Sequence, residues 1–299
     1  MSPRSAAPRP RRALLPALLA GLALLATACS GSPSAAPDTR SWDPGVREVA
    51  LEVDGRDRSY VLEPATGLAP GEPSAVVVVL HQEGGTPEGV AQETGLAGLR
   101  ARGATLVYPA GVDRSWSAGA CCGTPRDEGV DDLAFVDALL ADVAEQGPVD
   151  PDRTALVGYS SGGMLAYRYV CGRPGRLAAA VVVSGSLESP CEGSVTAPDV
   201  LAVHGRLDGT VGFDKPVFIT ALGLAPRPAV DTLDILTRGA DCAAAPRTTA
   251  LPDAEQSVWQ ECRGGDVEAV AVSEAGHGWG GLDATRRTSE FLLQHLLDQ

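Results

Sequence analysis

Residues 154–171, TALVGYSSGGMLAYRYVC, decide the fold. They predict a strand over 154–159 and a helix over 164–171, with Gly158-Tyr159-Ser160-Ser161-Gly162 at the turn between them. This is a G-x-S-x-G sequence, whose small residues permit a sharp turn. Such a turn exposes the Ser160 hydroxyl at the carboxyl edge of a sheet, near the positive end of a helix dipole. Ser160 is therefore our candidate nucleophile, and the alternative is that it only caps the helix.

The rest of the chain alternates strands with helices in the same way. The apolar run AVVVVL at 75–80 is unbroken, as in strands that are buried on both faces of a parallel sheet. A hairpin over 46–53 and 59–64 comes first, because Asp54-Gly55 is a turn signal. Together these patterns predict an α/β fold, with a mostly parallel sheet covered by helices on both faces. Further strands are expected at 104–109, 177–185, 199–205 and 267–274, and helices at 87–102, 131–146 and 285–297.

A serine nucleophile needs a general base, and the base needs an acid that fixes its tautomer. His277 lies in the loop AGHGWGG after the last predicted strand, where this architecture delivers its base. Asp208 follows the strand 199–205 and precedes His277, which gives the order Ser, Asp, His, and Asp214 is its nearest competitor. The other three histidines are expected to support the active-site edge or to pack: His81, His204 and His295. Asp131 and Asp132 are explained as carboxylates at a helix start.

The negative charge that develops on a substrate carbonyl requires two backbone N–H donors. One is expected from Ser161, the residue after the nucleophile. The other is expected from the loop His81–Gly85, and Glu83 or Gln82 is our candidate there.

Several further segments carry a family resemblance, among them LHQEGG, YPAGVDRSW, AGACCG, VLAVHGRLDGTV and GHGWGG. Together with the serine segment they resemble secreted α/β-hydrolase esterases, grouped as polyhydroxybutyrate depolymerases and feruloyl or acetyl xylan esterases, actinobacterial lipoproteins included. The resemblance spans nearly all of residues 46–299. It implies that Ser160, Asp208 and His277 form a catalytic triad, and that three aromatic residues line the substrate cleft: Tyr108, Trp116 and Trp279. The chain departs from the family pattern at Gln82, where glycine is usual, and at Gly280, where proline is usual.

Composition excludes some function classes. The formal net charge is −14, and four of the 24 basic residues but no acidic residue lie within residues 1–28. The rest of the chain therefore has 20 basic and 38 acidic residues. Nucleic acid is therefore not expected as a partner, because proteins bind its phosphate backbone mainly through clustered basic residues. Lys215 is the only lysine, so the chain has no phosphate-binding loop of the type that ends in lysine.

The N-terminus has the layout of an export signal. Basic residues up to Arg12 precede the apolar run 13–28, and Cys29 follows small residues, as at a lipoprotein processing site. We expect a signal peptide over 1–28, lipidation of Cys29 and a flexible tether over 29–43, followed by a catalytic domain over 44–299. The alternative is an ordinary cleaved signal with a chance cysteine. Both readings predict an exported protein. It is held at the cell envelope by the lipid, its only membrane contact, if Cys29 is lipidated, and it is secreted otherwise.

Six cysteines remain after Cys29, and an even count in an exported chain favours disulfides over a metal cluster. Cys242 and Cys262 are expected to pair. Neighbouring Cα atoms lie about 3.8 Å apart across a trans peptide, below the usual disulfide range. Cys121 and Cys122 are therefore expected to bond not to each other but to the remaining two, Cys171 and Cys191, in an order the sequence leaves open.

These features predict a monomeric serine esterase without metal or organic cofactor, acting on a small or oligomeric ester through an acyl-enzyme. Two alternatives remain open. One is a peptidase on the same scaffold. The other is a cell-envelope binding protein whose active site has decayed, for which Gln82 is the one argument.

Overall fold

The computed structural model describes residues 41–191, 195–220 and 222–298, which belong to one compact unit, Asp38–Gln299. The predicted signal peptide, Cys29 and most of the predicted tether lie outside the described residues. No helix in the described ranges is long and apolar enough to cross a bilayer.

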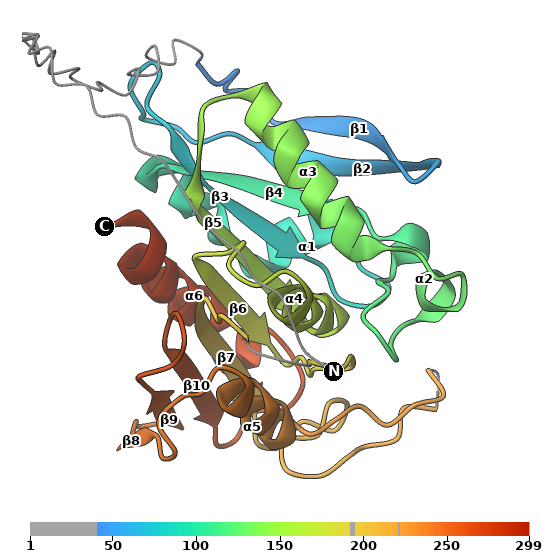
Figure 1. Cartoon of the computed structure of the whole chain (residues 1–299), viewed down its shortest axis with the longest axis vertical. Coiled ribbons are helices and arrows are strands. Elements are labelled where there is room, and N and C mark those ends of the chain that lie inside the picture. The colour runs from blue at the N-terminus through green and yellow to red at the C-terminus, as the bar shows by residue number, and fades with distance from the viewer. Residues whose placement is uncertain (1–40, 192–194, 221, 299) are drawn as a thin grey trace, which may run out of the picture. The chain divides into compact units, whose positions relative to one another are not determined.

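A single ten-stranded sheet runs through this unit in the order β1-β2-β4-β3-β5-β6-β7-β10-β9-β8 (Figure 1). Its central six strands, β4 to β10 in that order, are parallel, and the strands at both edges are antiparallel. The predicted α/β fold is confirmed. The strands span Arg47–Val53 (β1), Arg56–Glu63 (β2), Ser74–Leu80 (β3), Ala104–Pro109 (β4), Val149–Tyr159 (β5), Ala179–Val183 (β6), Asp199–Gly205 (β7), Arg247–Ala250 (β8), Ala254–Trp259 (β9) and Val267–Val272 (β10).

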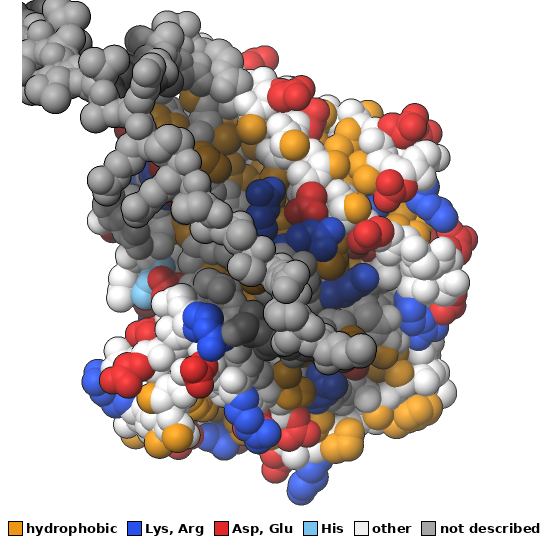
Figure 2. All heavy atoms as spheres, viewed as in Figure 1, with side chains coloured by type: hydrophobic (Ala, Val, Ile, Leu, Met, Phe, Trp, Pro, Cys, Tyr) orange, Lys and Arg blue, Asp and Glu red, His pale blue; other side chains and the backbone are white. Residues whose placement is uncertain are grey.

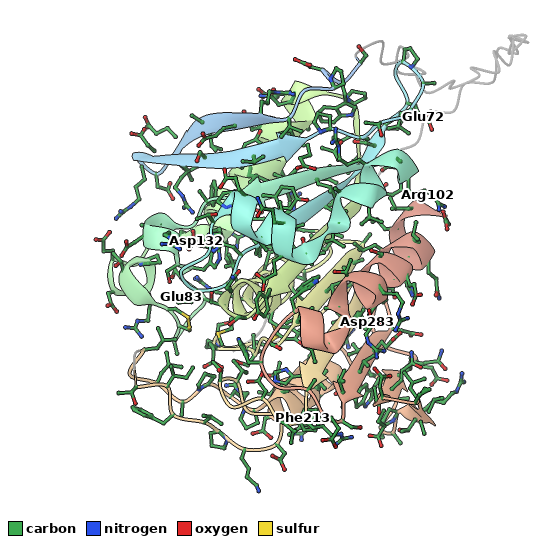
Figure 3. All side chains as sticks on the ribbon, turned by 180° about the vertical axis from the view of Figure 1, so that it is seen from behind. Glu72, Glu83, Arg102, Asp132, Phe213 and Asp283 are labelled. Atoms are coloured by element: carbon green, nitrogen blue, oxygen red, sulfur yellow. A yellow bond between two sulfur atoms is a disulfide. The ribbon has the colours of Figure 1, made fainter. Side chains whose placement is uncertain are left out.

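Helices cover both faces of the sheet. Helices α3 (Asp132–Gln146), α4 (Ser161–Gly172) and α5 (Ala229–Gly239) pack on one face, where they build the larger of two apolar cores. Helices α1 (Pro87–Thr94) and α6 (Ala284–Leu292) pack on the other, as the view from behind shows (Figure 3). Every residue of β3 is buried, which explains its unbroken apolar sequence.

Some elements differ from the sequence prediction. The helix expected over 87–102 is split at Gly95, which adopts the left-handed conformation and leaves a 3-10 helix, Leu96–Arg102. The last helix continues as a π-helical turn, Leu293–Leu297. The prediction lacked α5, the strands β8 and β9 at one edge of the sheet, and the short helix α2 (Gly123–Asp127). The two strands and α2 are short or exposed and carry little hydrophobic periodicity. The buried residues of α5 do recur at helical spacing, and this signal was overlooked.

Asp131 caps α3 as expected, since its carboxylate accepts hydrogen bonds from the Leu133 and Ala134 amides, both at 3.1 Å. Asp132 is more than a helix-start carboxylate. It is fully buried, pairs with Arg58 at 2.8 Å and accepts from the Ser117 amide at 2.7 Å. This ion pair therefore ties β2 and α3 to the loop that follows β4.

The disulfides correct one prediction. Cys242 pairs with Cys262 as predicted, but Cys171 pairs with Cys191, and Cys121 with Cys122. The prediction assumed a trans peptide between the adjacent cysteines, whereas this peptide is cis and their Cα atoms lie 3.1 Å apart. The end of α4 and the segment after β6 bring the Cα atoms of Cys171 and Cys191 within 5.2 Å, which leaves the adjacent pair to each other.

Charged side chains of both signs are interspersed on the face that carries α3 to α5 (Figure 2).

Candidate active site

Ser160 stands on a strained turn between β5 and α4. Its backbone adopts φ 54° and ψ −118°, which a side-chain-bearing residue rarely does. The flanking glycines are required by close approach: a Cβ on Gly158 would lie 2.3 Å from the Gly162 carbonyl oxygen. A Cβ on Gly162 would lie 2.4 Å from the Leu80 carbonyl oxygen, at the end of β3. The turn therefore holds the serine rigidly against the neighbouring strand.

The structure brings the three predicted side chains together. His277 Nε2 lies 3.0 Å from Ser160 Oγ, and His277 Nδ1 lies 2.8 Å from Asp208 Oδ2. The His277 ring also stacks on Tyr159, with centroids 5.7 Å apart. Asp214, the competing acid, is exposed. Serine, imidazole and carboxylate thus form one continuous chain of hydrogen bonds.

Asp208 is surrounded by donors. Its Oδ1 accepts from the Thr210 and Val211 amides, both at 2.8 Å, and its Oδ2 lies 3.2 Å from His204 Nε2 as well as bonding His277. Burial alone would raise the pKa of Asp208, but the hydrogen bonds from His204 and His277 hold it well below its usual range. The side chain therefore stays ionised beside His277.

His204 supports this carboxylate from behind. Its Nε2 donates to the Val211 carbonyl at 2.7 Å and faces Asp208 with the same N–H. A supporting role at the active-site edge is what the position of His204 at a strand end predicts, and this contact with Asp208 fits that role. His295 instead bonds Asp199 at 3.0 Å and stacks on Phe291, at the far end of β7.

The loop after β3 is held by His81. Its Nδ1 donates to the Gln82 carbonyl at 2.8 Å, while its Nε2 accepts from the Gly111 amide at 3.1 Å. The Gly85 amide donates to the same Gln82 carbonyl, also at 2.8 Å. Burial lowers the pKa of His81, so the ring stays neutral in this tautomer. The peptide between Gln82 and Glu83 is thus fixed in orientation.

The side chains of both candidate oxyanion residues in this loop, Gln82 and Glu83, are held by hydrogen bonds. Gln82 Nε2 donates to Glu93 Oε2 at 3.0 Å. Glu83 Oε2 accepts from Ser115 Oγ at 2.7 Å, and that hydroxyl also lies 3.1 Å from the Cys122 carbonyl oxygen. Burial raises the pKa of Glu83. Ser115 could not be predicted from the sequence, since it lies in an irregular loop without a recognisable pattern.

A pocket of about 330 Å³ opens over Ser160. Its walls combine the oxyanion loop, the Cys121–Cys122 disulfide and apolar side chains from α4 and from the long loop after β7. The lining residues are Gln82, Glu83, Cys121, Cys122, Tyr159, Ser160, Ser161, Met164, Thr210, Val211, Ile219, Leu222 and His277. Nothing in the sequence pointed to Ile219 or Leu222 as walls of this pocket.

The prediction that three aromatic residues line the substrate cleft is wrong. Tyr108 and Trp116 are fully buried and Trp279 is 2% exposed, and none of them lines the pocket over Ser160. Trp116 instead packs on His81 at 4.6 Å between ring centroids and donates to its carbonyl at 2.8 Å. Trp279 donates to Thr285 Oγ1 at 2.9 Å. Trp116 and Trp279 therefore support the loops that carry His81 and His277 from behind, and Tyr108 packs in the core.

Among the described residues, no three His, Cys, Asp or Glu side chains gather as a metal site would require. The chemistry this arrangement can perform is nucleophilic: a serine beside an imidazole that is backed by a carboxylate.

Comparisons with known proteins place this arrangement in a family. No protein-family model matches the chain. The chain is 32% identical to the esterase NocK of Nocardia uniformis subsp. tsuyamanensis over 259 residues, 79% of this chain and 74% of that protein. It is 29% identical to feruloyl esterase C of Emericella nidulans over 213 residues, 69% of this chain and 73% of that protein.

Among solved structures, the acetyl xylan esterase from Aspergillus awamori superimposes with a TM-score of 0.61 at 15% identity, covering 78% of this chain and 94% of that one. This likeness shows the α/β-hydrolase fold. The identity to NocK over most of both chains shows the family, and the chain therefore belongs to this esterase family of serine carboxylic-ester hydrolases.

Proposed function

We propose that the protein hydrolyses carboxylic esters through an acyl-enzyme on Ser160, with His277 as general base and Asp208 as its orienting acid. The observation that carries this proposal is the unbroken pair of hydrogen bonds from Ser160 Oγ to His277 and from His277 to Asp208, at 3.0 and 2.8 Å. A serine between a strand and a helix could also serve only as a helix cap. That role would not require an imidazole at hydrogen-bond distance from its hydroxyl.

The reaction begins when Ser160 Oγ attacks the ester carbonyl and gives its proton to His277 Nε2. The ionised Asp208 stabilises the imidazolium that forms. The tetrahedral intermediate collapses when His277 returns the proton to the departing alcohol, which leaves the acyl group on Ser160. Water, deprotonated by the same imidazole, then attacks the acyl-enzyme and releases the carboxylic acid.

The oxyanion is stabilised by the backbone N–H groups of Ser161 and Glu83. Ser161 begins α4, so its N–H lies in the first turn, where helices leave amides without a helical partner. In a trans peptide the N–H points opposite to the preceding carbonyl. Since His81 and Gly85 hold the Gln82 carbonyl on one side, the Glu83 N–H is directed to the other. This choice favours Glu83 over Gln82 as the second donor.

The pocket suits a compact acyl group. Its volume of about 330 Å³ lies near the lower end of the range for ligand pockets, roughly 300–1,000 Å³. Met164, Val211, Ile219 and Leu222 make much of its wall apolar. We therefore propose aryl or short-chain acyl esters as substrates. The relatives' names, feruloyl esterase and acetyl xylan esterase, agree with an aromatic and a short acyl group respectively.

Export forms part of the same proposal. Three disulfides are typical of proteins from oxidising compartments, and the basic and apolar N-terminal pattern fits a cleaved signal. We propose that the protein is exported and that Cys29 becomes its lipidated N-terminus. Mass spectrometry of the mature protein from its host tests this: a diacylated Cys29 is expected, and an unmodified start at another residue would refute lipidation.

The catalytic proposal is tested with Ser160→Ala. Turnover of an aryl acetate should fall by more than about 10³-fold. A fluorophosphonate should label the unmodified protein at Ser160 and leave the variant unlabelled. The control is Ser273→Ala, which removes an exposed serine and should change neither result. Retained turnover in a folded Ser160→Ala protein would refute the proposal.

Substrate class is tested with matched compounds on the unmodified protein. Aryl, acetyl and 3-hydroxybutyryl esters of one alcohol compare acyl groups, and the anilide of the preferred acyl group tests for peptidase activity. We expect the ester to be cleaved far faster than the anilide. Equal rates on ester and anilide would favour the peptidase alternative instead.

A further inference from the structure

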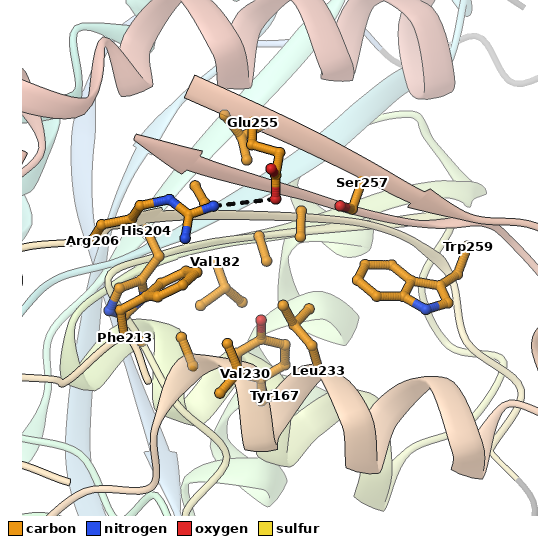
Figure 4. A pocket seen from close by; sticks show the side chains of 16 residues that line it. Tyr167, Val182, His204, Arg206, Phe213, Val230, Leu233, Glu255, Ser257 and Trp259 are labelled. Carbon is orange, nitrogen blue, oxygen red and sulfur yellow. Dashed lines mark hydrogen bonds and ion pairs between the residues drawn. The ribbon is translucent and has the colours of Figure 1, made fainter. Parts of the chain in front are cut away.

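A second cavity, of about 250 Å³, lies on the α5 side of the sheet (Figure 4). Strands β6, β7, β10 and β9 form one wall, and helices α4 and α5 form the other. Ser160, Ser161 and His277 do not line it, so it is distinct from the pocket over the candidate nucleophile.

The cavity exists because the residues that face it from the sheet are small. Ala202 on β7 and Ala269 and Ala271 on β10 offer only methyl groups at positions that face the helices. From α5, Leu233 closes part of the space but does not fill it. Small side chains on the sheet therefore leave a hollow between it and α5.

One polar group inside the cavity has no partner. The side chain of Tyr167, on α4, is 97% buried (3% exposed), and its hydroxyl points into the hollow (Figure 4). No hydrogen bond to it is formed by any described residue. Burial raises the pKa of Tyr167, so the hydroxyl stays protonated and is available as a donor. The hydroxyl borders the hollow and is therefore free to donate to a molecule bound there.

The mouth of the cavity is electrically balanced. Arg206 and Glu255 form an ion pair at 3.1 Å, and the Arg206 guanidinium also lies 4.9 Å from the ring centre of Phe213. Both charges are therefore satisfied within the protein. Inside, aromatic and aliphatic side chains predominate, with Trp259 at the end opposite Phe213 (Figure 4).

From these observations we propose that this cavity is a second binding site, for a neutral molecule with one aromatic ring and one hydrogen-bond acceptor, which Tyr167 recognises through its hydroxyl. The volume fits this class, because an engineered cavity of about 150 Å³ is known to bind benzene, and about 250 Å³ leaves room for a short substituent. The balanced mouth disfavours a charged ligand.

The site also borders the catalytic machinery. His204 lines the cavity, and its Nε2 lies 3.2 Å from Asp208 Oδ2. The cavity thus reaches the residue that supports the catalytic acid, although no residue lines both pockets.

The test uses acetophenone, a ring with one carbonyl, and ethylbenzene, which has nearly the same shape and lacks the acceptor. Binding of each is measured by calorimetry or ligand-observed NMR, on protein whose Ser160 has first been blocked with a fluorophosphonate. Tyr167→Phe removes only the hydroxyl. Tyr169→Phe is the matched control, since the Tyr169 hydroxyl bonds Asp137 at 2.7 Å outside this cavity. Ala269→Leu fills the space.

Acetophenone should bind the blocked protein more tightly than ethylbenzene. Tyr167→Phe should weaken acetophenone binding by about 2- to 10-fold, the effect of one hydrogen bond, and leave ethylbenzene binding and ester turnover unchanged. Ala269→Leu should abolish binding of both compounds, and Tyr169→Phe should abolish neither.

The proposal is overturned if acetophenone shows no saturable binding, if its binding ignores both Tyr167→Phe and Ala269→Leu, or if blocking Ser160 removes it. Should Ala269→Leu fail to fold, the comparison of the two compounds on Tyr167→Phe still decides. Should the fluorophosphonate fail to label, the proposed catalytic function is in error, but the Tyr167 measurements on unblocked protein still test the cavity.

Discussion

Asp208→Asn is the sharpest test of how this site works, because all four described contacts of the carboxylate come from donors. Two backbone amides bond Oδ1, and His277 and His204 face Oδ2. An amide group keeps one acceptor oxygen and gains an NH₂ donor. If the NH₂ is turned toward the backbone, it meets the Thr210 and Val211 amides, which both need an acceptor. If it is turned toward the histidines, it meets the Nδ1–H of His277 and the His204 N–H, which keeps the Val211 carbonyl as an acceptor.

The less costly orientation leaves the oxygen with the backbone amides and turns the NH₂ toward the histidines. His277 must then accept on Nδ1 and carry its proton on Nε2, where it can no longer take the Ser160 proton. The corresponding change in a trypsin-like triad lowers kcat by about 10⁴. We expect a loss of the same order, which is about 5 kcal/mol of transition-state stabilisation.

Asp208→Asn should also lower the thermal stability of the protein, because one buried N–H donor is left without an acceptor. An unsatisfied buried donor costs about 1–3 kcal/mol, which for a domain of this size lowers Tm by several degrees. The assay is kcat for an aryl acetate together with thermal unfolding. Asp214→Asn, an exposed change six residues away, is the control and should alter neither. If folded Asp208→Asn keeps kcat within tenfold of the unmodified protein, the assigned role of Asp208 is wrong.

Three further outcomes are expected. Glu83→Gln should raise Tm, and the gain should grow as the pH rises above the ordinary glutamate range. The raised pKa of Glu83 means that folding favours its protonated form, so the unmodified protein loses stability as this carboxyl ionises, whereas Gln stays neutral. Melting curves at pH 5 and pH 8 measure this, and an equal gain at both would contradict it. Gly162→Ala should destabilise the fold by about 1–3 kcal/mol and lower kcat, since its Cβ would meet two backbone carbonyls; urea unfolding and turnover measure both, and an unaffected protein would disprove the close approach. Replacing Cys242 and Cys262 together by serine should cost about 3 kcal/mol in urea unfolding under the loop-entropy view, and no change would show that their bridge restrains little.

The parts of the site that sequence predicted are those fixed by local pattern. The turn at Ser160 could be predicted because a strand, two glycines and a helix start lie within a few residues, and each glycine has a contact that excludes a side chain. The central strands were predicted from apolar runs, and β7 was predicted residue for residue. A single sequence was sufficient wherever the residues of one segment determine its structure without contacts from distant segments.

The parts that escaped prediction depend on contacts between distant segments. Whether Trp116 faces substrate or supports His81 is decided by packing across 35 residues, and an aromatic side chain suits both. Pairing of Cys171 with Cys191 depends on where the segment after β6 passes α4. Ile219 and Leu222 reach the pocket from an irregular loop, where hydrophobic periodicity is silent.

The meeting of Ser160 and His277, 117 residues apart, follows from strand direction. Because β5, β7 and β10 are parallel, their carboxyl ends share one edge of the sheet, and each is followed by one member of the triad. Since β7 and β10 are neighbours, the loops that follow them can join directly, and the Leu207 amide donates to the Ala275 carbonyl at 2.9 Å. Gly205 permits this contact, because a Cβ there would lie 2.3 Å from the same carbonyl oxygen. Asp208 and His277 are thus positioned as one unit, and the remaining distance to β5 is bridged by the His277 loop rather than by the sheet.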